Sequence, residues 1–122
     1  MKTFVTAVLI LAALIGATVL NAMATKSTVT EIEEALLQVG SDATKENAER
    51  IKACIAKVEE NRSSLHLSFR HTHIDQLVQV LNEALAYCLK GDAPSMNAMI
   101  AAATFKVERW KGAEAFTVYN IL

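Results

Sequence analysis

The first 25 residues contain the feature that most constrains this chain. From Phe4 to Leu20 there are 17 residues without a charged side chain, and the uncharged run continues to Thr25. At about 1.5 Å of rise per residue, an apolar helix of this length is close to the minimum that crosses a hydrocarbon core roughly 30 Å thick. Nothing downstream is long or apolar enough to surround such a segment in a core. We therefore expect a signal-anchor or transmembrane segment over residues 1–25 and a separate domain over residues 26–122.

The same segment has two possible fates. Lys2 before an apolar stretch is typical of a secretory signal, and Ala22-Met23-Ala24 is a small-x-small site for cleavage after Ala24. Signal peptides usually carry about 7 to 15 apolar residues, so the greater length here favours a retained transmembrane helix. The placement of Lys2 before the segment and of three glutamates after it indicates that the domain lies outside the cytoplasm. We expect a single-pass protein of the cell membrane; the alternative is secretion after cleavage.

The remainder of the chain has the composition of an all-α domain. Of the 122 residues 52% are hydrophobic, and one proline and four glycines leave little material for turns. Apolar residues are mainly Ala, Leu, Ile and Val, and they recur at steps of three and four in stretches that start near residues 28, 43, 72 and 92. We expect the N-terminal helix to be followed by a four-helix up-down bundle of two antiparallel helical hairpins.

Helix-end signals separate the first two of these stretches. Thr30 and Glu33 have the spacing of a capping box, which places the start of a helix near residues 28–30. Gly40 can end that helix in the left-handed conformation. Ser41 or Asp42 is then the expected N-cap of a long helix over about residues 43–68.

The later stretches are separated in the same way. Thr72 is the expected N-cap of the third helix, and Gly91 ends it. Asp92 and Pro94 open the last helix, because proline fits a first turn. The sequence leaves open whether the chain beyond Gly112 continues this helix.

Charge excludes one class of partner. The chain has 12 basic and 13 acidic side chains; without Lys2 the balance is 11 against 13, a net charge of −2. Nucleic-acid binding requires a basic face, and no cluster of Lys and Arg occurs in the sequence. We expect the membrane as one partner, an unknown protein as a possible second, and no nucleic acid.

Three histidines are candidates for a metal site: His66, His71 and His73. Imidazole binds zinc and copper, but no cysteine or carboxylate cluster completes a ligand set nearby. On a helix, residues two apart point about 200° away from each other. We expect capping or structural roles, with a ligand-binding or metal-binding module over His66–His73 as the alternative function.

Two further pairs are candidates for contacts inside the domain. Cys54 and Cys88 lie almost equally far from a turn near His71, so an antiparallel hairpin could bring them together in a disulfide; two buried free thiols are the alternative. Arg62 and Glu114 each occupy a position where the apolar pattern predicts a hydrophobic residue. They could form a buried ion pair, or each could reach the edge of the bundle.

Catalytic motifs are missing from the sequence. It contains no nucleophile elbow and no glycine-rich phosphate loop, and its Ser and Cys residues are scattered. We expect no enzyme and no cofactor.

The organisation of the chain resembles an uncharacterised family of short Gram-positive bacterial proteins, domain-of-unknown-function family four-three-six-three. The resemblance is carried by His71-Thr72-His73-Ile74-Asp75, and by Glu114 before the closing Asn120-Ile121-Leu122. It implies one N-terminal membrane segment and a helical domain, and no activity. The expected function is non-catalytic: a membrane-anchored helical protein that acts by protein contact or as a structural element of the envelope.

Overall fold

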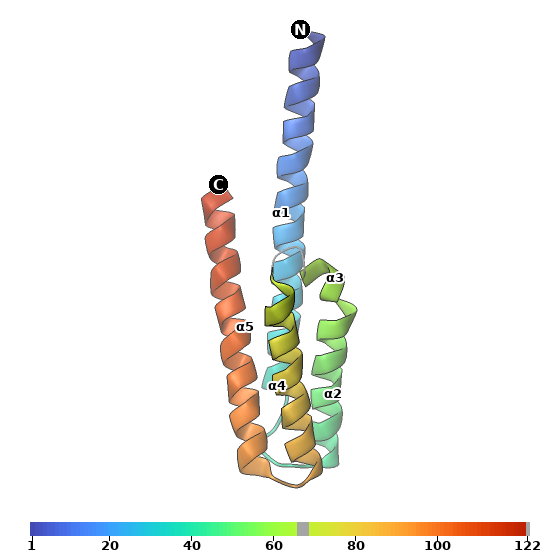
Figure 1. Ribbon diagram of the computed structural model, residues 1–122, viewed down its shortest axis with the longest axis vertical. Coiled ribbons are helices and arrows are strands. Elements are labelled where there is room, and N and C mark those ends of the chain that lie inside the picture. Colours follow the sequence, from blue (N-terminus) through green and yellow to red (C-terminus); the bar gives the residue numbers. More distant parts are fainter. Residues whose placement is uncertain (66–68, 122) are drawn as a thin grey trace.

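The computed structural model describes residues 1–65 and 69–121, apart from the side chains of residues 21, 22, 25 and 113–121. The described residues are almost all helical and contain no strand, which confirms the all-α prediction. The helices are α1 (Lys2–Leu37), α2 (Lys45–Glu60), α3 (Arg62–Leu65), α4 (His71–Leu89) and α5 (Ala93–Ile121). The N-terminal half of α1 extends away from all the others (Figure 1).

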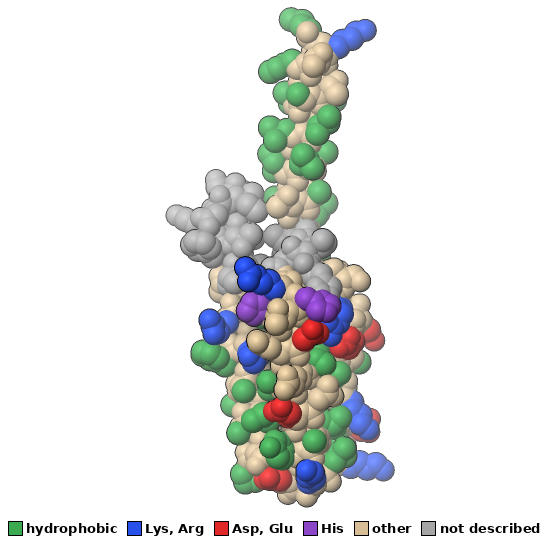
Figure 2. All heavy atoms as spheres, in the orientation of Figure 1, with side chains coloured by type: hydrophobic (Ala, Val, Ile, Leu, Met, Phe, Trp, Pro, Cys, Tyr) green, Lys and Arg blue, Asp and Glu red, His purple; other side chains and the backbone are tan. Residues whose placement is uncertain are grey.

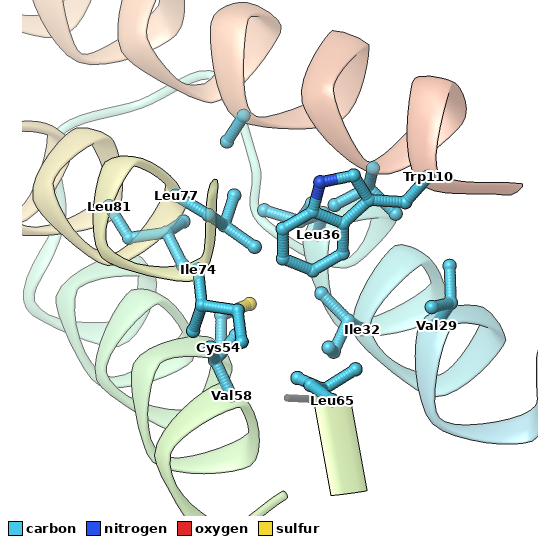
Figure 3. Packing of buried hydrophobic residues seen from close by; sticks show 12 residues of the cluster. Val29, Ile32, Leu36, Cys54, Val58, Leu65, Ile74, Leu77, Leu81 and Trp110 are labelled. Carbon is cyan, nitrogen blue, oxygen red and sulfur yellow. The ribbon is translucent and has the colours of Figure 1, made fainter. Parts of the chain in front are cut away.

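The C-terminal half of α1 packs with α2, α4 and α5, and we call this part the helical domain. Within it α1 contacts α2 and α5, and α4 also contacts α2 and α5. Their apolar faces enclose two clusters, and Figure 3 shows residues of the larger one. The larger cluster takes residues from every helix, among them Ile32, Val58, Leu65, Leu77 and Val107.

The core largely follows the predicted periodicity. Ile51, Val58, Ile74, Leu81 and Val107 belong to the stretches with apolar residues at steps of three and four, and all are fully buried. Cys54 lies within the larger cluster, whereas the next residue, Ile55, is only partly buried and packs against that cluster. Trp110 of α5 belongs to the same cluster. Its ring stacks on the ring of Phe69, with centroids 4.7 Å apart.

The helix α1 runs unbroken through the predicted capping box, so that prediction is wrong. Thr30 lies inside the helix, and its hydroxyl donates to the carbonyl of Lys26, one turn earlier. A threonine can satisfy its hydroxyl in this way without ending a helix. No proline or glycine lies between Leu20 and Thr30, so nothing in the sequence stops the apolar helix before it enters the domain.

The connection between α1 and α2 is organised by other residues than expected. Gly91 is the only described residue with positive φ, so Gly40 does not end α1 in the left-handed conformation. The N-cap of α2 is Thr44, not Ser41 or Asp42; its hydroxyl accepts from the backbone N–H of Asn47.

The ends of the later helices partly match the predictions. Gly91 has φ of 78° just after α4, and Asp92 Oδ1 accepts the N–H of Ser95 at the start of α5, as expected. Thr72 is not an N-cap, because α4 begins at His71 after Arg70. The predicted helix to residue 68 is too long, since α2 ends at Glu60. At the other end of the chain, α5 continues through Gly112 to Ile121.

Candidate membrane anchor and the domain end beside it

The N-terminal part of α1 is an apolar helix with nothing packed on it. Lys2–Leu20 is long enough to cross a membrane, has a mean hydropathy of 2.5, and has none of its residues buried in the protein. Its large side chains are mostly at least half exposed, as Figure 2 shows. A soluble protein rarely exposes a continuous apolar surface of this kind, so this segment is the strongest candidate for a functional surface. We call it the anchor segment.

Two threonine hydroxyls of the anchor segment are bonded within the helix itself. Thr6 Oγ1 donates to the carbonyl of Lys2, and Thr18 Oγ1 donates to the carbonyl of Leu14, each at 2.8 Å. In hydrocarbon an unsatisfied hydroxyl is costly, and a helical threonine avoids that cost by bonding the preceding turn. The two hydroxyls are therefore compatible with an apolar environment.

The anchor segment leads into the domain without a flexible joint. Among the described side chains Thr28 and Val29 are the first that are buried, and Ile32 and Leu36 follow on the same face. Eight residues separate Leu20 from Thr28, which is roughly 12 Å along a helix. Headgroups add only about 5 to 7 Å on each side of the hydrocarbon, so a membrane around the anchor segment would lie close to the end of the domain.

That end of the domain carries a network of charges around Arg62. Arg62 Nη1 lies 2.7 Å from Asp75 Oδ1, and Nη2 lies 2.8 Å from Glu59 Oε1. The hydrogen bond from Arg62 holds the pKa of Glu59 below its usual range, and the two acids raise the pKa of Arg62. Glu59 and Asp75 are thus partners of Arg62. The side chain of Glu114 lies outside the described part, so its pairing with Arg62 is not tested.

His71 and His73 lie at the same end of the domain. His71 Nε2 is 3.5 Å from Asp75 Oδ2, one turn along α4, and His73 is exposed. His66 lies outside the described residues. Within the described ranges, no three His, Cys, Asp or Glu side chains are grouped to hold a metal ion.

The two cysteines are buried free thiols, so the structure has the second of the two alternatives and not the disulfide. Cys88 Sγ contacts the carbonyl oxygen of Thr44 at 3.3 Å, and Thr44 lies ten residues, roughly 15 Å, before Cys54. The register differs because α2 ends only six residues after Cys54, whereas α4 starts 17 residues before Cys88. Burial raises the pKa of Cys54 to about 11.

Two shallow hollows lie on the surface of the helical domain. One, of about 470 Å³, lies between α1 and α5 beside the ion pair of Lys111 with Glu33. The other, of about 350 Å³, lies at the end far from the anchor segment, next to Cys88. Neither contains a nucleophile with a base and an acid among its described lining residues.

Comparison with known proteins gives no relative. A scan against protein-family models, a search of curated proteins and a search of solved structures each found no match to this chain.

Proposed function

We propose that this chain is a single-pass membrane protein whose helical domain lies outside the cytoplasm and acts, without catalysis, by protein contact or as a structural element of the envelope. The observation that carries the proposal is the unbroken helix α1. One half of it exposes an almost entirely apolar surface, and the other half supplies Val29, Ile32 and Leu36 to the core. A membrane is the environment that buries the first half.

We further propose that α1 and its three long neighbours, α2, α4 and α5, form a four-helix up-down bundle. Their contacts in the order α1, α2, α4, α5 and back to α1 support this arrangement. The resemblance to domain-of-unknown-function family four-three-six-three is also proposed as a true relationship. In its central motif the first histidine and the acid, His71 and Asp75, lie within 3.5 Å of each other, which gives the motif a local structural role.

Retention of the anchor segment is preferred over cleavage after Ala24. Residues 22–25 lie within α1, and a peptidase that binds its substrate in extended form must first unwind this part of the helix. N-terminal sequencing of the mature protein tests the point. We expect the leader to be present, and a chain that begins at Thr25 would show that the protein is secreted.

Extraction from native membranes tests the anchor itself. We expect detergent to release the protein and high salt to leave it in the membrane, because salt screens charges and does not weaken apolar burial. Changing Leu11 and Leu14 to Lys should move the protein to the soluble fraction, since each Lys near the middle of a span costs about 2.5 to 3.5 kcal/mol of insertion. Leu37→Lys is the matched control: Leu37 is 71% exposed on the same helix but outside the anchor segment. Salt release of the unaltered chain would contradict the proposal.

Orientation is tested by labelling from outside intact cells. Ser41 is exposed at the end of the domain far from the anchor segment, and the native thiols are buried. A Ser41→Cys variant should react with a membrane-impermeant maleimide before the cells are lysed. Reaction only after lysis would place the domain in the cytoplasm.

A further inference from the structure

The last helix extends beyond the domain toward the anchor segment. Trp110 is the last residue of α5 described as buried, and the helix continues to Ile121, which is eleven residues or roughly 16 Å farther. In Figure 1 this end of α5 rises past the rest of the domain along the length of α1.

An ion pair fixes how far the extension reaches. Lys111 Nζ lies 3.1 Å from Glu33 Oε1, and the two helices run in opposite directions. Ile121 is ten residues after Lys111, so it is level with the residue ten before Glu33, which is Met23. Met23 is only three residues, about 4.5 Å, from Leu20 at the end of the anchor segment. The end of α5 therefore stands at the level where a membrane around α1 has its surface.

The sequence of the extension suits that level. Residues 112–122 contain no Lys or Arg and a single acid, Glu114, and the remainder includes Phe116, Val118, Tyr119, Ile121 and Leu122. Tyrosine is enriched at membrane interfaces, where its ring is partly apolar and its hydroxyl reaches water.

We propose that the last turns of α5 insert into the headgroup region of the membrane that α1 spans, so that the domain touches the bilayer at two points. The partner that this end of α5 contacts is therefore the headgroup region of a phospholipid bilayer. The inference rests on the proposed membrane-spanning role of α1. It adds a second contact, which would fix the tilt of the domain.

Depth-dependent quenching of a thiol-linked fluorophore tests the proposal on the full chain in phosphatidylcholine vesicles. Asn120→Cys places the fluorophore in the extension, Leu14→Cys places it in the anchor segment, and Asn82→Cys places it on an exposed site of α4. The unaltered protein, with its two buried thiols, gives the background. Lipids with a doxyl quencher near the headgroup or near the chain end report depth.

We expect the fluorophore at residue 120 to be quenched by the headgroup-level doxyl more than by the deep one, and the fluorophore at residue 82 by neither. If residue 120 behaves like residue 82 while residue 14 is quenched, this inference is wrong and the anchor stands. If residue 14 is not quenched, the proposed function fails, and this inference fails with it. Thr117→Cys gives a second site should the first variant fold poorly.

A substitution pair separates lipid contact from contact with protein. In the labelled Asn120→Cys chain, changing Phe116 and Tyr119 to Ser should reduce quenching by the headgroup-level doxyl severalfold. Phe105→Ser is the matched control, because Phe105 is 60% exposed on the same helix inside the domain. Quenching that the Phe116 and Tyr119 changes leave intact would overturn the proposal, as would fluorophore self-quenching that rises with the protein-to-lipid ratio, which would indicate a second copy of the chain.

Discussion

Arg62, which begins α3 between α2 and α4, forms an ion pair with Asp75 on α4, with 2.7 Å between Nη1 and Oδ1. The pair lies at the end of the domain that is next to the anchor segment. Arg62 is 24% exposed and also binds Glu59, so its guanidinium is held from two sides.

Replacing Arg62 by Met should lower the free energy of unfolding by about 0.5 to 1 kcal/mol, the upper part of the range for partly exposed pairs. Trp110 fluorescence during urea titration of the full chain in detergent measures the change. Lys52→Met is the control, since its pair with Glu49 is more than half exposed on both sides and should contribute nothing measurable.

The pKa of Glu59 lies below its ordinary value of 4.5 in the folded chain. Its stabilisation is therefore present above pH 4.5 and lost as the pH falls through the lowered pKa. An effect of Arg62→Met that persists unchanged under strongly acidic conditions would contradict this reading.

Asn47 should be the most sensitive polar residue of the α1–α2 connection. It is 5% exposed; its Oδ1 accepts from the N–H of Gly40 and its Nδ2 donates to the carbonyl of Asp42. Asn47→Ala leaves both backbone groups without that partner and should cost about 1 to 3 kcal/mol of unfolding free energy. Asn82→Ala, at an exposed site, should stay within about 0.5 kcal/mol. Equal effects of the two changes in urea titration would refute the assigned role.

Two glycines should respond to alanine with opposite signs. Gly91 has φ of 78°, so Gly91→Ala forces a side chain into the left-handed region and should destabilise the domain by about 1 kcal/mol. Gly112 lies inside α5 with nothing within 4 Å of the added Cβ, and Gly112→Ala should stabilise by up to about 1 kcal/mol. Thermal unfolding by circular dichroism compares them. A destabilising Gly112→Ala would show that α5 is not helical there.

Cys54 should resist alkylation while the chain is folded, because its thiol is fully buried and its pKa is raised to about 11. The unfolded chain loses this proton near the ordinary pKa of 9.0, so stability should fall as the pH rises from 9.0 toward 11. The loss should be on the order of 1 to 2 kcal/mol. Urea titrations of the unaltered chain and of Cys54→Ala across this range measure it, and an identical pH dependence of the two would exclude Cys54 as the cause.

Zinc should not stabilise the domain. His71 and His73 both lie in the first turn of α4, where side chains two residues apart diverge by about 200°. Thermal unfolding with and without added zinc, together with elemental analysis of the purified chain, tests this. Stoichiometric zinc that disappears when both histidines are changed to Ala would establish the metal-binding alternative instead.

Apolar periodicity predicted the helices and most of their buried faces, because burial of a stripe such as Ile74, Leu77 and Leu81 is decided within one helix. The contacts between helices were harder to predict from the sequence. The sequence left a pair of Arg62 with Glu114 and a disulfide of Cys54 with Cys88 as open alternatives, and the disulfide assumed a short turn near His71. Ten residues from Asn61 to Arg70 form that connection instead, which shifts the register and brings Asp75 to Arg62.

The predicted capping box at Thr30 was wrong for a different reason, which is also physical. Thr30 has the spacing of a helix start, yet a capping box works only where the chain enters from a non-helical conformation. The apolar helix upstream continues into it, so Thr30 bonds the preceding turn. No sequence pattern indicated the role of Asn47, because that role depends on where the backbone of Gly40 and Asp42 lies in the folded chain.

The continuity of α1 turns the spacing between membrane and domain into an angle. Each residue of a helix adds 1.5 Å of length and about 100° of rotation. One residue inserted between Met23 and Lys26 would therefore swing the whole domain by more than a quarter turn about the anchor axis, whereas four would lift it by about 6 Å and bring it nearly back to its original bearing. The number of residues between the anchor segment and the domain thus sets the direction in which each surface of the domain faces.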